Sequence, residues 1–538
     1  RDWSSDVCSS DLRYSFDVRL SSITSDGYIE RANSNLKSFY VSAASINENS
    51  SLRFNIISGK EKTYQAWYGV TEDELQSNRR FNEAGQRPGK TPYENETDNY
   101  WQTHYQLFYN KKINGNWNLN ASAFTTTGRG YYEQYKTEQS YEHYGLKAPV
   151  VNGNRIDQTD LIRQLWLDNI YFGTNLSAQF KNTNREIILG GGSSNYNGNH
   201  FGKVIWAEYA IPDNHKWYDL DANKNEQHIF AKWSEKIDNF YIFSDVQVRN
   251  VNYTINGFRD NPTLNLNNNW LFINPKAGLR YTKNKMTSYI SYARARKEPN
   301  RDDFEAGIND MPKPETLNDF EASFQKVDKK YRWAVTLFYM NYKDQLVLTG
   351  KINDVGAYTR TNIPKSYRRG IELEGNYKLL DWLSINENFS LGQHKILQFK
   401  EYYDDYDNGG QKTNTYNKSD IALSPAFINH STLSVNLKND MELNWITKYV
   451  SRQYLDNTSR LDRSLDPYFL NDLQLNKSFK SKNGNTFSFI FQLNNILNTK
   501  YFPNGYTYSY QYGGELIKNN YFYPMAGRNW MFALNMRF

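Results

Sequence analysis

The final stretch of the chain, WMFALNMRF at 530–538, restricts the possible folds more than any other. Its alternate residues are apolar, and the residues between them are small, polar or mixed. A period of two is the pattern of a β-strand with one apolar face. An exposed edge this aromatic would promote aggregation, so the pattern predicts a strand that closes a barrel or is covered. The apolar residues are Trp530, Phe532, Leu534, Met536 and Phe538.

The same alternation recurs at 331–343, 433–437 and 487–493. Each stretch places aromatic or branched side chains on one face and mostly polar side chains on the other. A membrane barrel, with lipid outside and water inside, has this alternation. A soluble sandwich whose two apolar faces meet would show the same period.

Short and long connections alternate between the predicted strands. The short turns are at 47–50, 114–116, 182–184, 237–239, 283–285, 328–330, 379–381, 438–440 and 481–485. The long connections, polar and rich in aromatics, are at 60–103, 127–167, 196–226, 297–316, 399–425 and 499–529. Tight turns at one end and long loops at the other are typical of outer-membrane barrels, and a sandwich has little reason to separate them.

Composition excludes several classes of protein. Mean hydropathy is -0.82, 38% of residues are hydrophobic, and no apolar run approaches the roughly 20 residues of a membrane helix. Aromatic residues make up 16% of the chain, which suits interfacial girdles and ligand-binding loops, although a secreted carbohydrate-binding protein would also be aromatic. The net charge of +6 is well mixed and gives no basic stripe for nucleic acid. A single cysteine, Cys8, excludes an internal disulfide framework.

Counting two strands for each short turn and one at each end predicts an all-β, transmembrane antiparallel barrel of about 20 strands. Plugged outer-membrane transporters have about 22. The comparison predicts that one hairpin is missing.

The first residues have neither a strand pattern nor a signal-peptide pattern. Residues 2–12 resemble the translation of a sequencing adaptor, so we expect 1–12 to be non-native and 13–538 to form the barrel domain. The native amino terminus is then expected to be missing, and Cys8 belongs to the non-native segment.

Several motifs resemble those of TonB-dependent outer-membrane receptors, particularly the Bacteroidetes type. They are SDGYIER at 25–31, TYQAW at 63–67, GYYEQY at 130–135, KPET at 313–316, YKDQL at 342–346, YVSRQYLDN at 449–457, LNNILNTKY at 493–501 and YPMAGRNW at 523–530. Each motif is weak alone, but their order and spread over the chain after Leu12 are specific.

The resemblance implies a barrel of a Gram-negative outer membrane, filled by a plug on which the TonB energy-coupling complex pulls. The partners it implies are outer-membrane lipid, that complex acting through the plug, and a small-molecule ligand; a surface lipoprotein is a further candidate. The sequence departs from the family pattern because it shows no plug, coupling box or signal peptide.

Candidate ligand contacts lie in the long connections, where a ligand would first meet the protein. Aromatic faces beside a cation could hold a planar, anionic metal chelate, and an exposed histidine could ligate haem iron. Each tyrosine could equally be a girdle or loop-packing residue, and each histidine a solvated one. The candidates are Tyr64, Trp67, Tyr68, Arg129, Tyr131, Tyr132, Tyr135, His200, Tyr506 and Tyr508.

Other clusters favour structural roles. Asp404, Asp405 and Asp407 lack the spacing of a calcium loop and suggest a solvated acidic loop. Gly190–Gly192 lacks the Lys-Ser/Thr of a phosphate loop and suggests close packing. No nucleophile, base and orienting group occur at readable spacing, so we predict no catalytic activity, no metal site and no cofactor.

The sequence therefore predicts a receptor for energy-coupled uptake of a scarce nutrient, with a ferric siderophore or another metal chelate favoured. Uptake of an oligosaccharide, haem or cobalamin is the alternative within the family. A passive porin or adhesin barrel is the alternative outside it, and an outer-membrane enzyme a third class.

Overall fold

A computed structural model describes residues 13–538 apart from 210, 213–214, 307–310, 354–357 and 482. The predicted non-native segment 1–12, with Cys8, lies outside the described residues. Regular structure is almost entirely β, as the alternation predicts.

The principal sheet has 23 strands in the described part of the chain, antiparallel except where β17 and β25 briefly run parallel. Of these, β18, β25 and β26 belong to long connections. Setting these three aside leaves 20 strands, the number that the sequence predicts.

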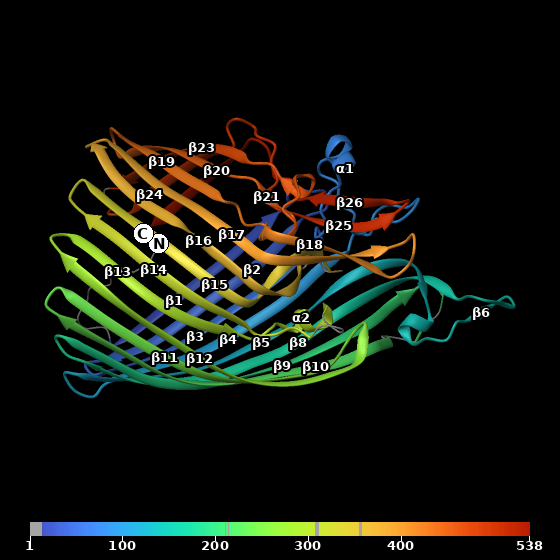
Figure 1. The fold of residues 1–538 in the computed structure, drawn as a ribbon, viewed down its shortest axis with the longest axis horizontal. Helices are drawn as coiled ribbons and strands as arrows, with labels where there is room; N and C mark the ends of the chain where they lie inside the picture. Colours follow the sequence, from blue (N-terminus) through green and yellow to red (C-terminus); the bar gives the residue numbers. More distant parts are fainter. Residues whose placement is uncertain (1–12, 210, 213–214, 307–310, 354–357, 482) are drawn as a thin grey trace. The chain divides into compact units, whose positions relative to one another are not determined.

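The chain divides into two units, which we describe separately. The first comprises Arg1–Ala66, Glu83–Glu235 and Asp245–Ile273. It holds β1 (Tyr14–Ser25), β2 (Ser34–Asn47), β3 (Ser50–Tyr64), β4 (Thr97–Lys112), β5 (Trp117–Ser140), the 3-10 helix η1 (Glu142–Tyr144), β6 (Val150–Val151), β7 (Asn154–Arg155), β8 (Gln158–Lys181), β9 (Arg185–Ala207) and nearly all of β10 (His215–Ile237). Figure 1 shows β2 to β5 and β8 in blue to teal.

The second unit comprises Trp67–Asn82, Lys236–Ser244 and Asn274–Phe538, so β11 (Phe240–Phe258) and β12 (Asn261–Lys283) contribute to both units. Its remaining elements are α1 (Glu72–Ser77), β13 (Met286–Lys297), α2 (Arg301–Ala306), β14 (Glu315–Val327), β15 (Tyr331–Ile352), β16 (Tyr358–Leu380), β17 (Leu383–Asp405), β18 (Gln411–Asp420), β19 (Phe427–Leu437), β20 (Met441–Val450), β21 (Gln453–Tyr454), the 3-10 helix η2 (Leu461–Arg463), β22 (Ser464–Leu465), β23 (Tyr468–Lys480), β24 (Thr486–Asn494), β25 (Gly505–Tyr512), β26 (Glu515–Phe522) and β27 (Asn529–Arg537).

Every predicted short turn separates two strands at the predicted place. For example, 114–116 lies between β4 and β5, and 438–440 lies between β19 and β20. In the first of these turns, the Asn114 side chain accepts hydrogen bonds from the backbone amides of Asn116 and Trp117, at 2.9 and 3.0 Å. Asparagine is favoured in turns because its side chain can satisfy backbone amides in this way.

The long connections are shorter than the sequence predicts, because strands extend into them. β9 continues to Ala207 and β10 begins at His215, within the predicted loop 196–226. The two strands pair there, with Tyr196 opposite Lys224. The prediction that His200 is a loop residue is therefore wrong, because His200 lies in β9.

The alternation predicted for the end of the chain is confirmed in β27. This strand pairs antiparallel with β24, where Phe532 lies opposite Phe491 and Leu534 opposite Phe489. The apolar row is exposed, with Trp530 at 70% and Phe532 at 56%.

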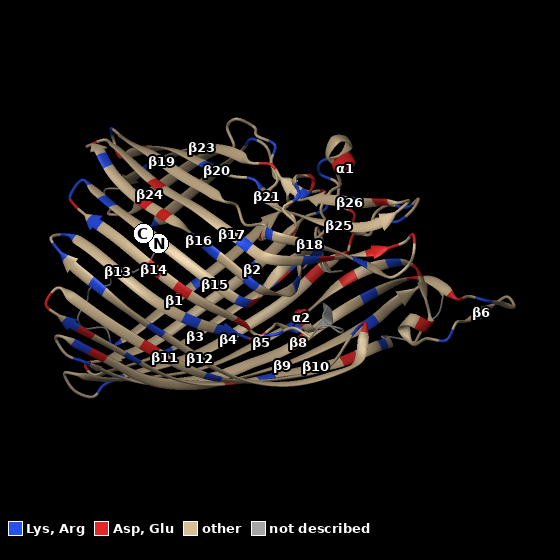
Figure 2. Cartoon of the chain, in the orientation of Figure 1, with Lys and Arg blue, Asp and Glu red and all other residues tan. Residues whose placement is uncertain are grey.

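The opposite face of β24 belongs to a ladder of polar side chains that crosses β19, β20, β23 and β24. Ser434 donates to Asn444 at 2.6 Å, and Gln474 donates to Gln492 at 3.1 Å. Asn444 and Gln474 join these pairs at 3.5 Å. Figure 2 shows acidic and basic residues interspersed along the strands and turns. One face is thus apolar and the other polar. This difference fixes the strand register, because a slip of one residue would move the apolar side chains to the polar face.

We predict that arginine is tolerated on the polar face of β24 but not on its apolar face. Phe491→Arg should destabilise the protein in lipid by about 2–4 kcal/mol, the cost of arginine facing the middle of a bilayer. The matched control is Gln492→Arg, one residue along the strand. Urea unfolding in lipid vesicles measures both. Equal costs for the two variants would contradict the assignment of the faces.

Candidate functional site

Two long hairpins of the second unit lie against each other at their tips. β25 runs beside β17, with Tyr510 opposite Asp404. The Asp407 carboxylate accepts hydrogen bonds from the backbone amides of Gly513 and Gly514, at 2.7 and 2.9 Å. Both glycines have positive φ, 64° and 82°, which other residues rarely adopt. The hairpin β17–β18 therefore holds the tip of β25–β26.

Asp405 shapes the tip of β17–β18. It is 4% exposed and accepts hydrogen bonds from the backbone amides of Asp407 and Asn408, at 3.1 and 3.2 Å. Lys412 lies 2.9 Å away and, together with the Asn408 side chain and the amides, lowers the pKa of Asp405 to about 2. The sequence suggested a solvated acidic loop, but Asp405 is buried because the turn needs an acceptor for its amides.

The predicted ligand contacts Tyr506 and Tyr508 lie in β25. Tyr506 is only 2% exposed, and its ring stacks on Tyr521 with centroids 4.7 Å apart. The Gly69 amide donates to the Tyr506 hydroxyl at 3.2 Å, while the half-buried Tyr508 donates to the carbonyl of Ile352 at 2.8 Å. Both side chains hold the hairpin in place.

Trp67 and Tyr68 belong to a segment that pairs with the same hairpin. Val70 and Phe522 exchange two backbone hydrogen bonds, at 2.9 and 2.8 Å. The Tyr523 hydroxyl donates to the Trp67 carbonyl at 2.7 Å. The structure therefore brings Trp67, Tyr68, Tyr506 and Tyr508 to one region of the second unit, and both side chains of the segment are half-buried.

Helix α1 completes this segment. Thr71 caps it by accepting from the Glu74 amide at 3.2 Å, and the Glu74 carboxylate accepts from the Thr71 amide at 2.8 Å. This reciprocal arrangement is a capping box, which stabilises a helix too short to form alone.

Of the most exposed tyrosines near these tips, Tyr402 and Tyr406 are absent from the sequence candidates, whereas Tyr512 lies in the predicted aromatic connection 499–529. Tyr402, Tyr406 and Tyr512 are 54%, 67% and 64% exposed. The ring of Tyr406 meets that of Tyr510 edge-on, with centroids 5.6 Å apart. The alternating tyrosines of 506–512 are visible in the sequence, but exposure at the tip depends on how the two hairpins meet.

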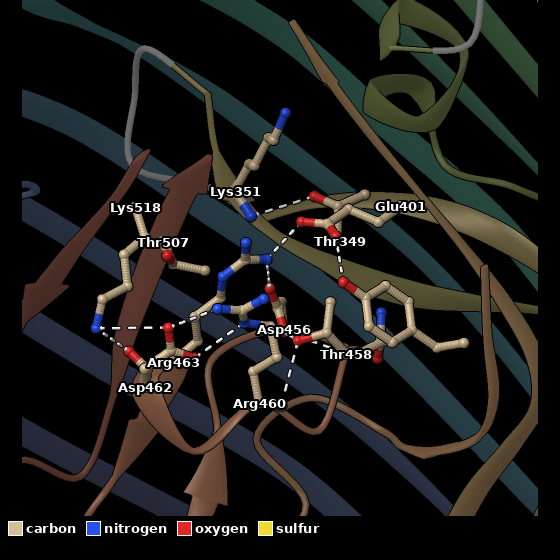
Figure 3. A network of polar contacts seen from close by, with 12 residues as sticks. Thr349, Lys351, Glu401, Asp456, Thr458, Arg460, Asp462, Arg463, Thr507 and Lys518 are labelled. Atoms are coloured by element: carbon tan, nitrogen blue, oxygen red, sulfur yellow. Dashed lines mark hydrogen bonds and ion pairs between the residues drawn. The ribbon is translucent and has the colours of Figure 1, made fainter. Parts of the chain in front are cut away.

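A buried arginine anchors the connection between β20 and β23 (Figure 3). Arg463 is 1% exposed and bonds to the carboxylates of Glu401 and, at 2.9 Å, Asp456. Tyr416 donates a further hydrogen bond to Glu401 at 2.8 Å. Arg463 thus joins this connection to the hairpin β17–β18.

The same connection also contacts three other segments. Asn457 donates to the carbonyl of Leu348 at 2.5 Å and accepts from the amide of Ala422 at 2.8 Å. Lys518 of β26 donates to the carbonyl of Asp462 at 2.7 Å. This buried polar network holds four connections in one arrangement and supplies the rigid support on which exposed side chains can bind.

A second polar cluster lies in the first unit, around Glu133. Its carboxylate accepts hydrogen bonds from Tyr93, Asn95 and Gln164, at 2.6, 2.5 and 2.6 Å. The candidate Tyr64 is buried beside it and donates to the carbonyl of Tyr93 at 2.6 Å.

Tyr135 lies in the same cluster. Its hydroxyl donates to Asp160 at 2.6 Å, and the guanidinium of Arg87 lies 5.1 Å from its ring. Its amide donates to Glu96 at 2.9 Å. Glu96 is 4% exposed, and burial raises the pKa of its carboxyl to about 7 although that hydrogen bond opposes the shift.

Arg129 and Tyr131 share the face of β5 that carries the exposed Trp117 and Leu119. Both contact Trp166, which lies 4.5 Å from the ring of Tyr131 and 5.4 Å from the guanidinium of Arg129. Because Arg129 and Tyr131 share a face with exposed apolar residues, this face favours a position for both side chains at the membrane boundary. Tyr132 and His200 lie on the opposite faces of β5 and β9, and both are half-buried.

The arrangement supports binding and no evident chemistry. Within the described ranges, no group of three His, Cys, Asp or Glu side chains is placed to hold a metal ion. No helix in those ranges is long and apolar enough to cross a membrane. The chemical capacity of both clusters is aromatic contact, hydrogen bonding and charge.

The sequence matches the family described as TonB dependent receptor-like, beta-barrel, over residues 40–496, and the chain belongs to that family. No curated protein matches significantly. The resemblance read from the motifs is therefore confirmed at the level of the family. Barrels of this family lie in the outer membrane of Gram-negative bacteria, and its members are transporters rather than enzymes.

Solved structures share the fold at low sequence identity. The ferric yersiniabactin uptake receptor FyuA of Yersinia pestis has a TM-score of 0.69 at 12% identity, covering 98% of this chain and 76% of its own. The ferric-catecholate import receptor Fiu of E. coli K12 has a TM-score of 0.67 at 13% identity. The match covers 98% of this chain and 78% of that receptor. The ferric citrate transporter FecA has a TM-score of 0.72 at 13% identity. The match covers 98% of this chain and 73% of that transporter.

We predict that Arg463 is essential for the order of the buried polar network. Arg463→Ala leaves Glu401 and Asp456 buried without their cation, a change that typically costs about 3–5 kcal/mol. Hydrogen exchange should accelerate at residues 451–467 and 401–412.

Arg460→Ala is the matched control, because Arg460 is 42% exposed and its pair with Asp462 is solvent-screened. Such pairs contribute less than about 1 kcal/mol. Similar exchange in the two variants would refute the role assigned to Arg463.

We predict that the connection around Glu96 loosens as the pH rises. The folded pKa of about 7 exceeds the usual 4.5, so the folded form holds a proton that the unfolded form releases between these values. Stability therefore falls through this window and is constant above it. Hydrogen exchange at residues 83–97, corrected for intrinsic rates, should accelerate from about pH 5 to pH 8.

Glu96→Gln should abolish this pH dependence, because glutamine stays neutral and can still accept the Tyr135 amide. Glu94→Gln, at an exposed neighbouring position, serves as the control. If Glu96→Gln retained the acceleration, another group would be responsible.

Proposed function

We propose that the chain is the barrel of a receptor for energy-coupled uptake of a metal chelate, with a ferric siderophore favoured, through the outer membrane. Its partners would be the TonB energy-coupling complex, acting through a plug, and the chelate itself. Membership of the family supports coupling and a small-molecule ligand. The likeness to receptors for ferric chelates supports the fold only, because identity is low.

The observation that carries the choice of ligand is the pair of docked hairpins. Asp407 fixes the tip of β25–β26 against β17–β18, and Tyr402, Tyr406 and Tyr512 stay exposed beside it. Rigid, exposed aromatic rings bind flat ligands with little loss of conformational freedom. A catecholate chelate presents such rings.

The residues proposed from the sequence fall into four groups in this proposal. Tyr68, Tyr132 and His200 are half-buried and stay candidate contacts. Tyr64 and Tyr506 are buried, and we propose that they position their connections instead. Arg129 and Tyr131 would serve at the membrane boundary, while Trp67, Tyr135 and Tyr508 would contact ligand only at their exposed edges.

Oligosaccharide uptake is the second candidate, because exposed tyrosines also stack on sugar rings. A surface lipoprotein partner would accompany this function more naturally than chelate uptake. The two candidates differ in charge: a ferric chelate is commonly anionic, whereas a neutral sugar needs hydrogen-bonding partners around the rings.

We expect saturable binding of a ferric catecholate by the purified chain, measured through quenching of its tryptophan fluorescence. The panel should include ferric citrate, a ferric hydroxamate, haem, cobalamin and a maltodextrin. Tyr406→Ala combined with Tyr512→Ala should weaken the preferred ligand about tenfold, since each aromatic contact contributes about 0.5–1.5 kcal/mol.

Tyr377→Ala is the control, since Tyr377 is exposed at the other end of β16, near a short turn. Preferential binding of the maltodextrin would assign the receptor to sugars. An absence of saturable binding across the panel would favour a passive barrel.

A further inference from the structure

Four cations gather on one face of β13, β15 and β16, in the second unit. On β16, Lys365 and Arg369 lie on the same face as the exposed Ile371. Ser366, next to Lys365, is buried on the opposite face. On β15, Lys343 shares the face of the exposed Leu337 and Tyr339. Arg294 is exposed on the same face of β13 as Ile290. All four therefore lie on the apolar face of the sheet.

The register places two of these cations against each other. Lys343 is directly opposite Lys365 in the ladder between β15 and β16. Like charges directly opposite destabilise a sheet, because their Cβ atoms are only about 5 Å apart. An anion bound between them would remove this cost.

No carboxylate of the described residues neutralises the group. Within the described part of the chain, Arg294, Lys343 and Lys365 form no ion pair, and Arg369 donates to the Gln393 amide oxygen at 3.1 and 2.8 Å. The neighbouring Lys395, by contrast, is paired with Asp420 at 2.6 Å. The four cations are thus available to an external anion.

An apolar groove of about 660 Å³ lies immediately below them on the same strands. Ile290, Ala322 and Leu337 form one row across it, and Phe320 and Tyr339 form the next row. Arg369 lies opposite Tyr339, so this row of the groove ends at a guanidinium. A smaller groove lined by Tyr339, Arg369 and Leu391 continues the surface.

The height of the cations matches the edge of a bilayer. A strand rises about 3.3 Å per residue and barrel strands tilt by roughly 40°, so Lys343 lies about 30 Å above the lower end of β15 at Tyr331. The hydrocarbon core is about 30 Å thick. The groove then faces acyl chains, and the cations face headgroups.

We propose that this surface, the Lys343–Lys365 surface, binds a membrane lipid that carries phosphate groups and several acyl chains. The phosphates contact Lys343, Lys365, Arg369 and Arg294, and an acyl chain fills the groove beside Ala322. Charge complementarity favours this occupant, since the free cations lie directly above an apolar groove. The surface is separate from the candidate ligand site.

The probe is diphosphorylated lipid A with a fluorescent acyl chain, titrated into the full chain in detergent. Lys343→Gln combined with Lys365→Gln should weaken binding at least about tenfold, since a cation near a phosphate surface contributes about fivefold. Lys326→Gln, on the same face of β14 but at its lower end, should leave binding unchanged.

Arg294→Gln combined with Arg369→Gln is the second variant, in case the first does not fold, and should weaken binding similarly. Ala322→Trp, which fills the groove, should also weaken it. Removing both phosphates from the probe should abolish the difference between Lys343→Gln/Lys365→Gln and the unsubstituted chain.

Three results would overturn the proposal. Equal binding by Lys343→Gln/Lys365→Gln and Lys326→Gln would show that the cations have no role. Full displacement of the probe by inorganic pyrophosphate would indicate an anion site without a lipid. Stronger binding of polyglutamate than of the probe would assign the surface to an acidic protein partner.

Discussion

The structure depends on the requirement that every backbone amide and carbonyl inside a bilayer finds a partner within the protein. An antiparallel ladder meets this requirement between strands, so side chains are free to follow the solvent on each face. The exposed apolar row of β27 and the polar ladder from Ser434 to Gln492 are two consequences of one constraint. A period of two then follows for every strand that crosses the membrane.

Above the membrane the ladder continues, but a different interaction determines the structure. Buried charged groups with several polar partners join the connections, beside apolar clusters such as Leu455, Leu465 and Phe522. Arg463 with Glu401 and Asp456 does this in one unit, and Glu133 with Tyr93 and Gln164 does it in the other. Such networks are costly when incomplete, and this cost favours a single arrangement of the loops.

The strands and turns of the membrane-spanning part can be predicted from the sequence, whereas the structure of the connections outside the membrane cannot. The turn at 114–116 and strand β27 are readable because lipid enforces alternation and turns need particular residues. The sequence predicts a loop for the upper parts of β9 and β10 because asparagines, glycines and charged residues interrupt the apolar alternation there. The contact of Asp407 with Gly513 and Gly514 joins segments far apart in sequence, so no local pattern announces it.

The docking of the two hairpins constrains how this receptor can diverge. Asp407 reaches both glycine amides only while each tip keeps its length and its turn. An insertion in either hairpin would separate them, whereas compensating insertions in both could preserve the contact. The two connections are therefore expected to vary in length together, in paired steps rather than one loop at a time.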